Sequence, residues 1–403
     1  LNPRLFPDQI EYIVNHAQNR FIFVDTSFIS VIVNVLDKLP TLEGLVVMTD
    51  KENMTDDMRK IGIPVYCYEE LLEMEDNTFV WPLLDKDTAS SLCYTSGTTG
   101  NPKGVLYSHE FNLNHSMISA HGDVFDLSAK DSFLLIVPMF HANGWGLPLS
   151  VPMVGGKLVL PGPFMDGKSL YDFIKVEKCN KTCAVPTVMT ILIDHLDSNN
   201  LQIPSMNEIY IGGSAVPQSM IEGFEVRYNV DVNHGWGMTE TVVGTFNCHL
   251  PFMDELNFEQ RMKVRCKQGR PPFGMEMKIV DNEGNSLPHD GVAFGKLMVR
   301  GPRVIERYYK AKESALDKDG WFDTGDVSTI DKYGFMQITD RTKDIIKSGG
   351  EWISSVDIEN TAVGHPEVQI AACLGVKHVK WEERPLLIAV KKEGCDPSKA
   401  SIL

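Results

Sequence analysis

Apolar residues near the start of the chain follow two spacings, that of a helix and that of a strand. They recur every three or four positions from Ile10 to Ala17, which predicts an amphipathic helix. The apolar run 21–25 that follows predicts a buried strand. The same two patterns then predict a second helix over 28–39 and a second strand over 45–48. This alternation of strands and helices indicates a parallel sheet with right-handed crossovers.

The middle of the chain continues the alternation after an acidic stretch, residues 76–88, that we expect to be a loop. Further strands are predicted at 133–137, 157–160 and 208–211. A helical stripe of apolar residues runs from Val188 to Leu196, between the last two of these strands. His195 lies on that stripe, so a position in the core or at its boundary is expected for this histidine.

Later in the chain the pattern changes. Apolar and polar residues alternate over 275–280 and again over 296–300, with a turn-forming sequence between them. Such alternation predicts antiparallel hairpins with one face in water. A charged break at 340–344 precedes a predicted capped helix at 354–363. A small final unit is therefore expected to start at the end of that break.

Composition and charge narrow the functional classes. The 403 residues are 43% hydrophobic and 23% charged, as in ordinary globular proteins. The net charge of −16 argues against a nucleic-acid binder or a binder of anionic membranes. No apolar run approaches the length of a membrane span and the start shows no signal-peptide pattern, so we expect a cytoplasmic protein. The eight cysteines are scattered, which favours reduced, mostly buried thiols over a zinc site.

Both ends of the chain look cut. It opens with Leu1 rather than an initiator methionine, and it stops at Leu403 without an evident ending. We therefore expect a fragment of a longer protein, with any organelle-targeting signal in the missing termini.

The most distinctive stretch is residues 94–104, Tyr-Thr-Ser-Gly-Thr-Thr-Gly-Asn-Pro-Lys-Gly. Extended structure is predicted on both sides of it, ahead of a helix near His109. Its glycines allow close approach to a ligand, and its hydroxyls, N–H groups and lysine are donors for phosphate oxygens. The residues that would hold a polyphosphate are Thr95, Ser96, Gly97, Thr98, Thr99, Gly100 and Lys103. On composition alone a solvated linker is an equally good interpretation, and the spacing differs from that of P-loop NTPases.

The string itself resembles the phosphate-loop signature of the adenylate-forming (AMP-binding) superfamily, which includes acyl-CoA synthetases, luciferases and peptide-synthetase adenylation domains. Five further motifs follow in that superfamily's order, so the resemblance covers essentially the whole chain. It implies an α/β fold with a large, N-terminally truncated adenylation domain at 1–340, built from parallel α/β sheets plus a small antiparallel β unit. A hinge at 341–346 and the start of a smaller, truncated α+β domain at 347–403 would follow. The motifs are most similar to medium- and long-chain fatty acyl-CoA synthetases, and methylmercaptopropionate-CoA ligases are also similar.

Two of these motifs follow predicted strands. His141 and Trp145 come just after the strand at 133–137, where open α/β sheets bind ligands. A core aromatic residue beside a loop histidine is the alternative. The resemblance implies that both residues line the acyl pocket and that the one at Trp145 gates it. Gly213 and Ser214 lie in a glycine turn that is a weak signal alone, and the resemblance puts this turn between the adenine and the acyl group.

The motif at 234–240, His-Gly-Trp-Gly-Met-Thr-Glu, is a stronger signal. An aromatic ring between glycines offers an open face to a planar base, Thr239 can donate to a phosphate, and Glu240 is an oxygen ligand suited to Mg²⁺. A packed tryptophan in a turn is the alternative. The resemblance implies nucleotide contacts for His234, Gly235, Trp236 and Thr239, and substrate contacts for Gly213 and Gly237. Trp236 departs from the Tyr or Phe that is more common there.

The last two motifs are charged. Asp326 lies in a Thr-Gly-Asp turn, where it would usually be a turn former, and the resemblance makes it the ribose ligand. Arg341 offers a forked donor for ribose or phosphate oxygens. The resemblance makes Lys343 the pivot of the hinge and brings glycines 349–350 close to coenzyme A. It also assigns Lys347 and Trp352 to cofactor binding. A solvated charge run is the alternative for this segment.

Together the motifs imply an ATP-dependent ligase. A carboxylic acid, a fatty acid in the first instance, would attack the α-phosphorus of ATP, and coenzyme A would then take the acyl group from acyl-AMP as a thioester. The expected catalytic residues are Thr95, Glu240, Arg341 and Lys343, with Mg²⁺ on Thr95 and Glu240. The family's catalytic lysine is expected beyond Leu403.

Several alternatives stay open. The acid could be another short carboxylate such as methylmercaptopropionate, or the acyl group could pass to a carrier protein or be oxidised as in luciferases. A phosphate-loop NTPase and a non-catalytic nucleotide-binding homologue are the other classes. The expected partners are the acid, ATP and coenzyme A, without nucleic acid. Related synthetases often dimerise, so a homodimer is a further expectation.

Overall fold

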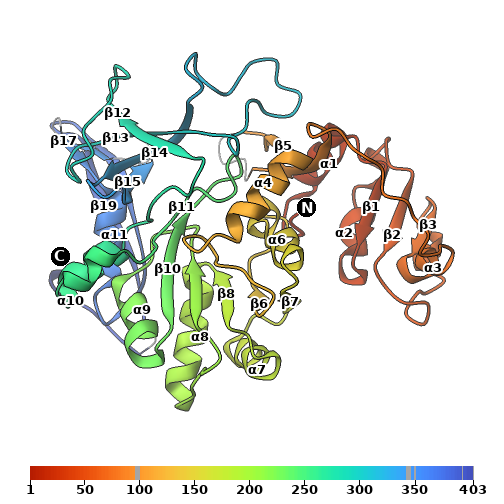
Figure 1. Cartoon of the computed structure of the whole chain (residues 1–403), viewed down its shortest axis with the longest axis horizontal. Helices are drawn as coiled ribbons and strands as arrows, with labels where there is room; N and C mark the ends of the chain where they lie inside the picture. The colour runs from red at the N-terminus through yellow and green to blue at the C-terminus, as the bar shows by residue number, and fades with distance from the viewer. Residues whose placement is uncertain (96–99, 342–345, 349–350, 393, 403) are drawn as a thin grey trace. The chain divides into compact units, whose positions relative to one another are not determined.

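The computed structural model describes residues 1–95, 100–341, 346–348, 351–392 and 394–402. They form two compact units, Leu1–His109 and Glu110–Leu403. Figure 1 gives the elements of both units in chain order. The domain boundaries expected from the sequence, with a hinge at 341–346, stay a prediction.

The first unit holds a three-stranded parallel sheet in the order β1-β2-β3, followed by the antiparallel hairpin β4-β5. Its elements are α1 (Pro7–Ala17), β1 (Phe21–Val24), η1 (Thr26–Phe28), α2 (Ile29–Val33), η2 (Leu36–Lys38), β2 (Gly44–Val47), η3 (Met58–Lys60), β3 (Val65–Cys67), α3 (Tyr68–Glu73), β4 (Ala89–Tyr94) and β5 (Gly104–Ser108). The first predicted helix, both strands, their parallel pairing and the loop at 76–88 are confirmed.

Two expectations for this unit are wrong in part. Strand β1 is not buried on both faces, because Phe21 and Phe23 are 41% and 59% exposed. It is an edge strand, and only the face that carries Val24 packs into the core, with alternate side chains pointing the other way. The predicted helix at 28–39 is broken into α2 and η2. Its run of β-branched residues has low helix propensity, which fits this break.

The second unit is built around a six-stranded sheet in the order β11-β10-β9-β8-β6-β7. All neighbouring strands are parallel except β10 and β11. The strands are β6 (Ser132–Leu135), β7 (Lys157–Val159), β8 (Lys181–Ala184), β9 (Glu208–Ile211), β10 (Asp231–Trp236) and β11 (Thr245–Phe246). The helices are α4 (His109–Ser119), α5 (Ala142–Trp145), α6 (Leu147–Met153), α7 (Gly167–Glu177), α8 (Pro186–Asn199), α9 (Gln218–Glu222), the π-helix η4 (Gly223–Arg227), η5 (Pro251–Glu255) and α10 (Phe258–Arg265). The strands predicted in this region and the helix that carries the half-buried His195 are confirmed.

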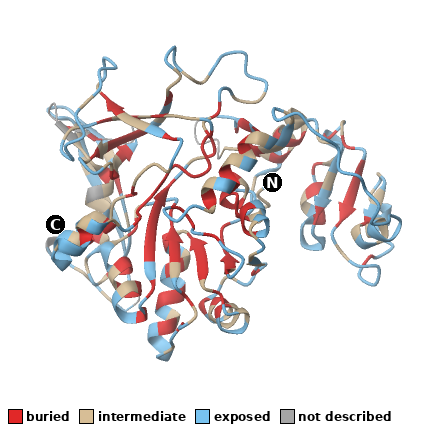
Figure 2. Ribbon diagram, in the orientation of Figure 1, coloured by how far each residue is buried: buried red, intermediate tan, exposed pale blue. Residues whose placement is uncertain are grey.

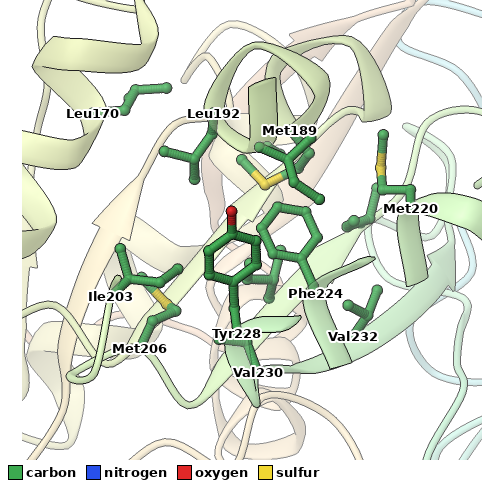
Figure 3. Close-up of a cluster of buried hydrophobic side chains, with 14 of the residues drawn as sticks. Leu170, Met189, Leu192, Ile203, Met206, Met220, Phe224, Tyr228, Val230 and Val232 are labelled. Carbon is green, nitrogen blue, oxygen red and sulfur yellow. The ribbon is translucent and has the colours of Figure 1, made fainter. Parts of the chain in front are cut away.

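The core of this unit lies between the sheet and helices α7, α8 and α9. Figure 3 shows Leu192 and Met189 of α8 near Phe224 of η4, Tyr228 at its end and Val232 of β10. Figure 2 shows that the buried residues concentrate on strands β10, β8 and β6. When both faces of a sheet are covered, a ligand can reach it only at the strand ends. A binding site can therefore form in the loops that follow these strands.

Two antiparallel sheets follow. The first has the order β12-β13-β14-β15, with β12 (Glu276–Val280), β13 (Phe294–Arg300), β14 (Phe322–Ile330) and β15 (Met336–Arg341). The second has the order β17-β16-β19-β18, with β16 (Ile346–Ser348), β17 (Glu351–Ile353), β18 (Val368–His378), β19 (Glu382–Lys391) and the helices α11 (Ser355–Val363) and α12 (Lys399–Ile402). The antiparallel pairing, the alternation in β13 and the late helix are confirmed. In β12 the alternation is not found, because Ile279 and Val280 are both buried.

Two further expectations concern helices and thiols. Within the described residues, no helix combines the length and the apolar character that crossing a bilayer requires. All eight cysteines are free, and six of them are buried, which confirms the expectation of reduced, mostly buried thiols.

Candidate active site

Most of the candidate residues of the second unit meet at the carboxyl ends of its parallel strands. A cavity of about 570 Å³ lies there, beyond β9 and β10. Seven sequence-predicted residues line it: Gly213, Ser214, Gly235, Trp236, Gly237, Asp326 and Arg341. Segments more than a hundred positions apart in the sequence therefore contribute to one site, as expected for ligand binding in an open α/β sheet.

Trp236, Asp326 and Arg341 form a connected cluster on the wall of this cavity. The indole Nε1–H of Trp236 donates to Oδ2 of Asp326 at 2.9 Å, and Arg341 Nε lies 3.5 Å from Oδ1. Asp326 on β14 is the direct cross-strand partner of Arg341 on β15, which explains why the two side chains meet. The indole N–H of Trp236 supplies this donor, which a phenylalanine at the same position would lack.

Burial dominates the electrostatics of the Asp326 carboxyl group. Asp326 is 5% exposed, and this burial raises its pKa above the usual value of 3.8, while Arg341 and the Trp236 N–H act in the opposite direction. A carboxylate whose charge is partly uncompensated gains from new donors, and the two hydroxyls of a ribose are such donors.

Backbone packing at Gly237 keeps the turn after β10 open. A Cβ atom on this residue would lie 2.1 Å from the carbonyl oxygen of Val242. Any other residue would therefore displace the backbone of this turn from the segment at Val242 and Val243.

His234 stands behind the cavity wall and does not line it. It is 1% exposed, its Nδ1–H donates to the Cys266 carbonyl at 2.9 Å, and its Nε2 accepts from Gln268 at 3.4 Å. Burial lowers its pKa to about 4, so the imidazole is neutral at physiological pH. Gln268 does line the cavity, so His234 acts on this wall through Gln268. Its direct contact with a nucleotide stays a prediction.

Glu240 and Thr239 also lie outside the lining of the cavity. Glu240 is 6% exposed, and its Oε1 accepts from the Tyr308 hydroxyl at 2.6 Å. Burial and the neighbouring carboxylate raise the pKa of Tyr308, so its hydroxyl stays protonated and donates. Within the described ranges Oε2 has no hydrogen-bond partner.

No group of three or more His, Cys, Asp or Glu side chains in the described part of the chain could hold a metal ion. Mg²⁺ usually takes one or two carboxylates together with phosphate oxygens and water. A single buried glutamate with one unengaged oxygen therefore fits that ion.

A second, much smaller cavity adjoins the first. It has a volume of about 30 Å³ and shares Gly213 and residues 235–238 with the larger cavity. His141, Trp145, Gly212, Val242, Val243 and Phe246 are among its other lining residues. Burial lowers the pKa of His141, which favours its neutral form. His141 and Trp145 thus line one cavity, and their role in holding an acyl group stays a prediction.

Comparison with known proteins decides the family. Residues 1–309 match the model of the AMP-binding enzyme family. This chain belongs to that family. Its full length aligns with the 3-methylmercaptopropionyl-CoA ligase of Ruegeria lacuscaerulensis at 49% identity, covering 74% of that protein. It also aligns with the medium-chain-fatty-acid--CoA ligase of Ectopseudomonas oleovorans at 46% identity, covering 73% of that protein.

The fold of the AMP-binding enzymes is confirmed by a solved structure. The crystal structure of the anthranilate CoA ligase AuaEII in complex with anthranoyl-AMP superposes with a TM-score of 0.86 at 24% identity. The superposition covers 100% of this chain and 73% of that one. At this identity the likeness speaks for the fold alone.

Some candidate residues of this AMP-binding enzyme belong to the first unit. Thr95 and Lys103 close the neck of the phosphate loop, where Thr95 N–H donates to the Lys103 carbonyl at 2.9 Å and Lys103 N–H donates to Thr95 Oγ1 at 3.0 Å. Gly100 has a φ of +128°, a conformation that other residues rarely adopt. The nucleotide contacts of these residues stay predictions. Outside the described residues, or with side chains outside them, lie Ser96, Gly97, Thr98, Thr99, Lys343, Lys347 and Trp352.

The far wall of the larger cavity was missed at the sequence level. It is formed by Gln268, Asp340, Ser355, Glu359, Cys373 and Glu383, with others. Asp340 is 1% exposed, and its Oδ2 accepts from the Ser355 N–H at 2.8 Å, so it caps helix α11. The helix was predicted from the sequence. Its contact with Asp340, which lies fifteen positions earlier, is tertiary, and the local sequence pattern does not show it.

Proposed function

We propose that this protein joins a carboxylic acid to coenzyme A in an ATP-dependent, AMP-forming reaction. The family membership and the two CoA ligases that align with the whole chain support this activity. The observation that carries it is the juxtaposition of two cavities. One is lined by the Trp236–Asp326–Arg341 cluster, and the other, smaller and lined largely by apolar residues, opens beside the same glycine turns.

In this proposal each cavity has its own ligand. The larger one takes the nucleotide, with Trp236 beside the adenine and the Asp326 carboxylate accepting from the ribose hydroxyls. Arg341 holds ribose or phosphate oxygens. The smaller cavity takes the acid, so that the carboxylate meets the α-phosphorus in line at the shared turns. The carboxylate oxygen bonds to phosphorus, pyrophosphate leaves, and the thiol of coenzyme A then displaces AMP from the acyl group.

A magnesium ion belongs to this proposal as well. Glu240 would supply one carboxylate oxygen to it, while Tyr308 orients that carboxylate. When bound, Mg²⁺ would neutralise the charge on the phosphates of ATP. The role of Thr95 as a further ligand stays a prediction.

We propose a short acid as the preferred substrate. The acid cavity is small, with a volume of about 30 Å³ against about 570 Å³ for the larger cavity. A long fatty acyl chain would need a large displacement of Trp145, and an acid of the length of 3-methylmercaptopropionate a smaller one. Two of the similar proteins, at 49% and 47% identity, are named 3-methylmercaptopropionyl-CoA ligases.

The test is pyrophosphate release by the full-length protein with 3-methylmercaptopropionate, butyrate, octanoate and palmitate, followed by detection of the CoA thioester. The proposal predicts that kcat/KM falls as the acid lengthens. Pyrophosphate without thioester would favour transfer to another acceptor, and ADP in place of AMP would refute the adenylation. Inactivity with every acid would refute the ligase proposal as a whole.

Trp145→Ala should move this preference toward longer acids. The change removes one of the two tryptophans of the acid cavity wall, and buried large-to-small changes leave space that a ligand can fill. We expect the ratio of kcat/KM for octanoate to that for butyrate to rise about tenfold, as one or two accommodated methylenes would give. Trp321→Ala, outside both cavities, is the control. An unchanged ratio would mean that Trp145 does not limit acid length.

A further inference from the structure

The acid cavity, lined by His141, Trp145, Val242 and Val243 among others, has two walls in unfavourable backbone conformations. In the first wall, residues 142–146, five consecutive residues have φ between +37° and +72°, which is ordinary for the two glycines and uncommon for Ala142 and Trp145. In the second, Val242 has a φ of +61°, which is rare for a β-branched residue. Such conformations persist only where surrounding groups hold them in place.

His115 holds the first wall. This residue of helix α4 is 2% exposed, and its Nε2–H donates to the Trp145 carbonyl at 2.9 Å. Its ring lies directly against the last residue of the wall, since a Cβ on Gly146 would come within 2.2 Å of it. Burial lowers the pKa of His115 to about 4, so the imidazole is neutral and Nε2 carries the proton that it donates.

Arg303 holds the second wall in the same way. It is 2% exposed, and its Nη1 donates to the Val243 carbonyl at 3.1 Å, one residue after the strained Val242. In the described part of the chain no carboxylate pairs with this guanidinium. The neighbouring segment adds one backbone bond, from Ile305 N–H to the Glu240 carbonyl at 3.2 Å.

Neither side chain, buried as it is, contributes as much to the stability of the fold as an apolar residue would. Among the residues that the structure describes, the buried atoms His115 Nδ1 and Arg303 Nη2 have no hydrogen-bond partner. A buried polar group left unpaired costs stability, and a buried cation without a counter-charge costs more, so apolar residues would serve stability better. What His115 and Arg303 each supply is one donor at the backbone of a cavity wall.

We propose that His115 and Arg303 are positioning residues that fix the two strained walls of the acid cavity and thereby determine which acids it accepts. The inference deepens the proposed function, because it takes this cavity as the acid site. Loss of either hydrogen bond lets the wall relax. The acid is then held in a less defined position, while Asp326 and Arg341, which belong to β14 and β15, keep their place in the larger cavity.

The first part of the test changes His115. His115→Phe keeps the ring and removes the donor, and we expect the KM of the acid to rise about five- to tenfold, the effect of one hydrogen bond, with the KM of ATP changed less than about twofold. His115→Gln restores a donor and should recover most of the loss. Ser116→Ala, a buried change on the same helix, is the matched control and should leave both constants unchanged.

The second part changes Arg303. Arg303→Met should raise the KM of the acid by a similar factor and flatten the dependence on acid length, and Arg303→Lys should restore part of both. Arg265→Met is the matched control, because Arg265 is also 2% exposed but pairs with Glu225 and Asp231 away from the cavity. It should lower the Tm and leave the preference among acids unchanged. If the KM of the acid and the KM of ATP shift together in His115→Phe, Arg303→Met and Arg265→Met, the proposal is overturned.

The deciding measurement does not depend on activity. Hydrogen exchange should accelerate at the amides of 142–146 in His115→Phe and at those of 242–244 in Arg303→Met, and at neither wall in Arg265→Met. If the wild-type protein activates no acid, the ligase proposal fails, and these exchange rates still test the two residues. Unchanged exchange at both walls would refute the positioning role.

Discussion

Asp326→Asn is expected to raise the Tm of the unliganded protein and to weaken ATP binding about a hundredfold. Burial raises the pKa of Asp326, so ionising it costs more in the folded state than in the unfolded chain. This cost is present at neutral pH and disappears as the pH falls below 3.8, the unfolded value. An amide carries no charge, keeps an acceptor for the Trp236 N–H, and removes the cost.

The loss of ATP affinity has a separate cause. The carboxylate would accept from both ribose hydroxyls, and each hydrogen bond to a charged group contributes about 1.5–3 kcal/mol. Exchanging this acceptor for an amide, which also brings an N–H donor toward the ribose, accounts for a factor of about 10² in Kd. By the same reasoning, ATP binding by the wild-type protein should weaken with falling pH earlier than an ordinary aspartate would dictate, because protonation of Asp326 begins at a higher pH.

Two measurements check this prediction, calorimetric titration with ATP and thermal unfolding without it. Asp323→Asn on the same strand is the control, since Asp323 is exposed and does not line the cavity. It should change the Kd by less than about twofold, as surface substitutions do. A lower Tm for Asp326→Asn would contradict the electrostatic argument, and an unchanged Kd would take Asp326 out of the nucleotide site.

The parts of the site that were predictable from the sequence are those formed by residues close together in the chain. The turn at Gly213 follows a predicted strand, and the stretch from Gly235 to Gly237, at the end of β10, was identified as part of a motif. Asp326 and Arg341 were identified through their resemblance to family motifs. Their contact, however, depends on the register of β14 against β15, which no local pattern specifies.

The parts that were not predictable arise from tertiary contacts. Gln268 lies in no motif. Its side chain accepts from the Ile338 N–H of β15 at 2.7 Å and contacts His234 of β10, so it connects these two strands at the cavity wall. His115 and Arg303 look like ordinary residues of a helix and a loop, and only their burial beside strained turns distinguishes them. The exposed face of β1 was missed for a related reason: an apolar run does not tell which faces of a sheet are covered.

Glu240→Gln should lower the rate of pyrophosphate release about 10²- to 10³-fold, the range found when a group that stabilises charge on reacting atoms is removed. The amide has nearly the same shape, so it keeps the contact with the Tyr308 hydroxyl but is a far weaker ligand for Mg²⁺ than a carboxylate. Tyr308→Phe leaves the carboxylate in place and removes the donor that orients it. We expect a smaller loss there, about tenfold, as for other groups that hold a metal ligand.

Titrating Mg²⁺ separates a metal-binding role of Glu240 from a purely structural one. If Glu240 holds the ion, Glu240→Gln should need a higher Mg²⁺ concentration for half-maximal rate, and the Mg²⁺ dependence of ATP binding in calorimetry should shift in the same direction. Glu306→Gln, an exposed change in the segment that carries Tyr308, should leave both unchanged. Glu240→Gln could instead be slow at every Mg²⁺ concentration with a normal half-maximal value. That result would assign the Glu240 side chain a structural role in the loop after β10, where it contacts the Tyr308 hydroxyl.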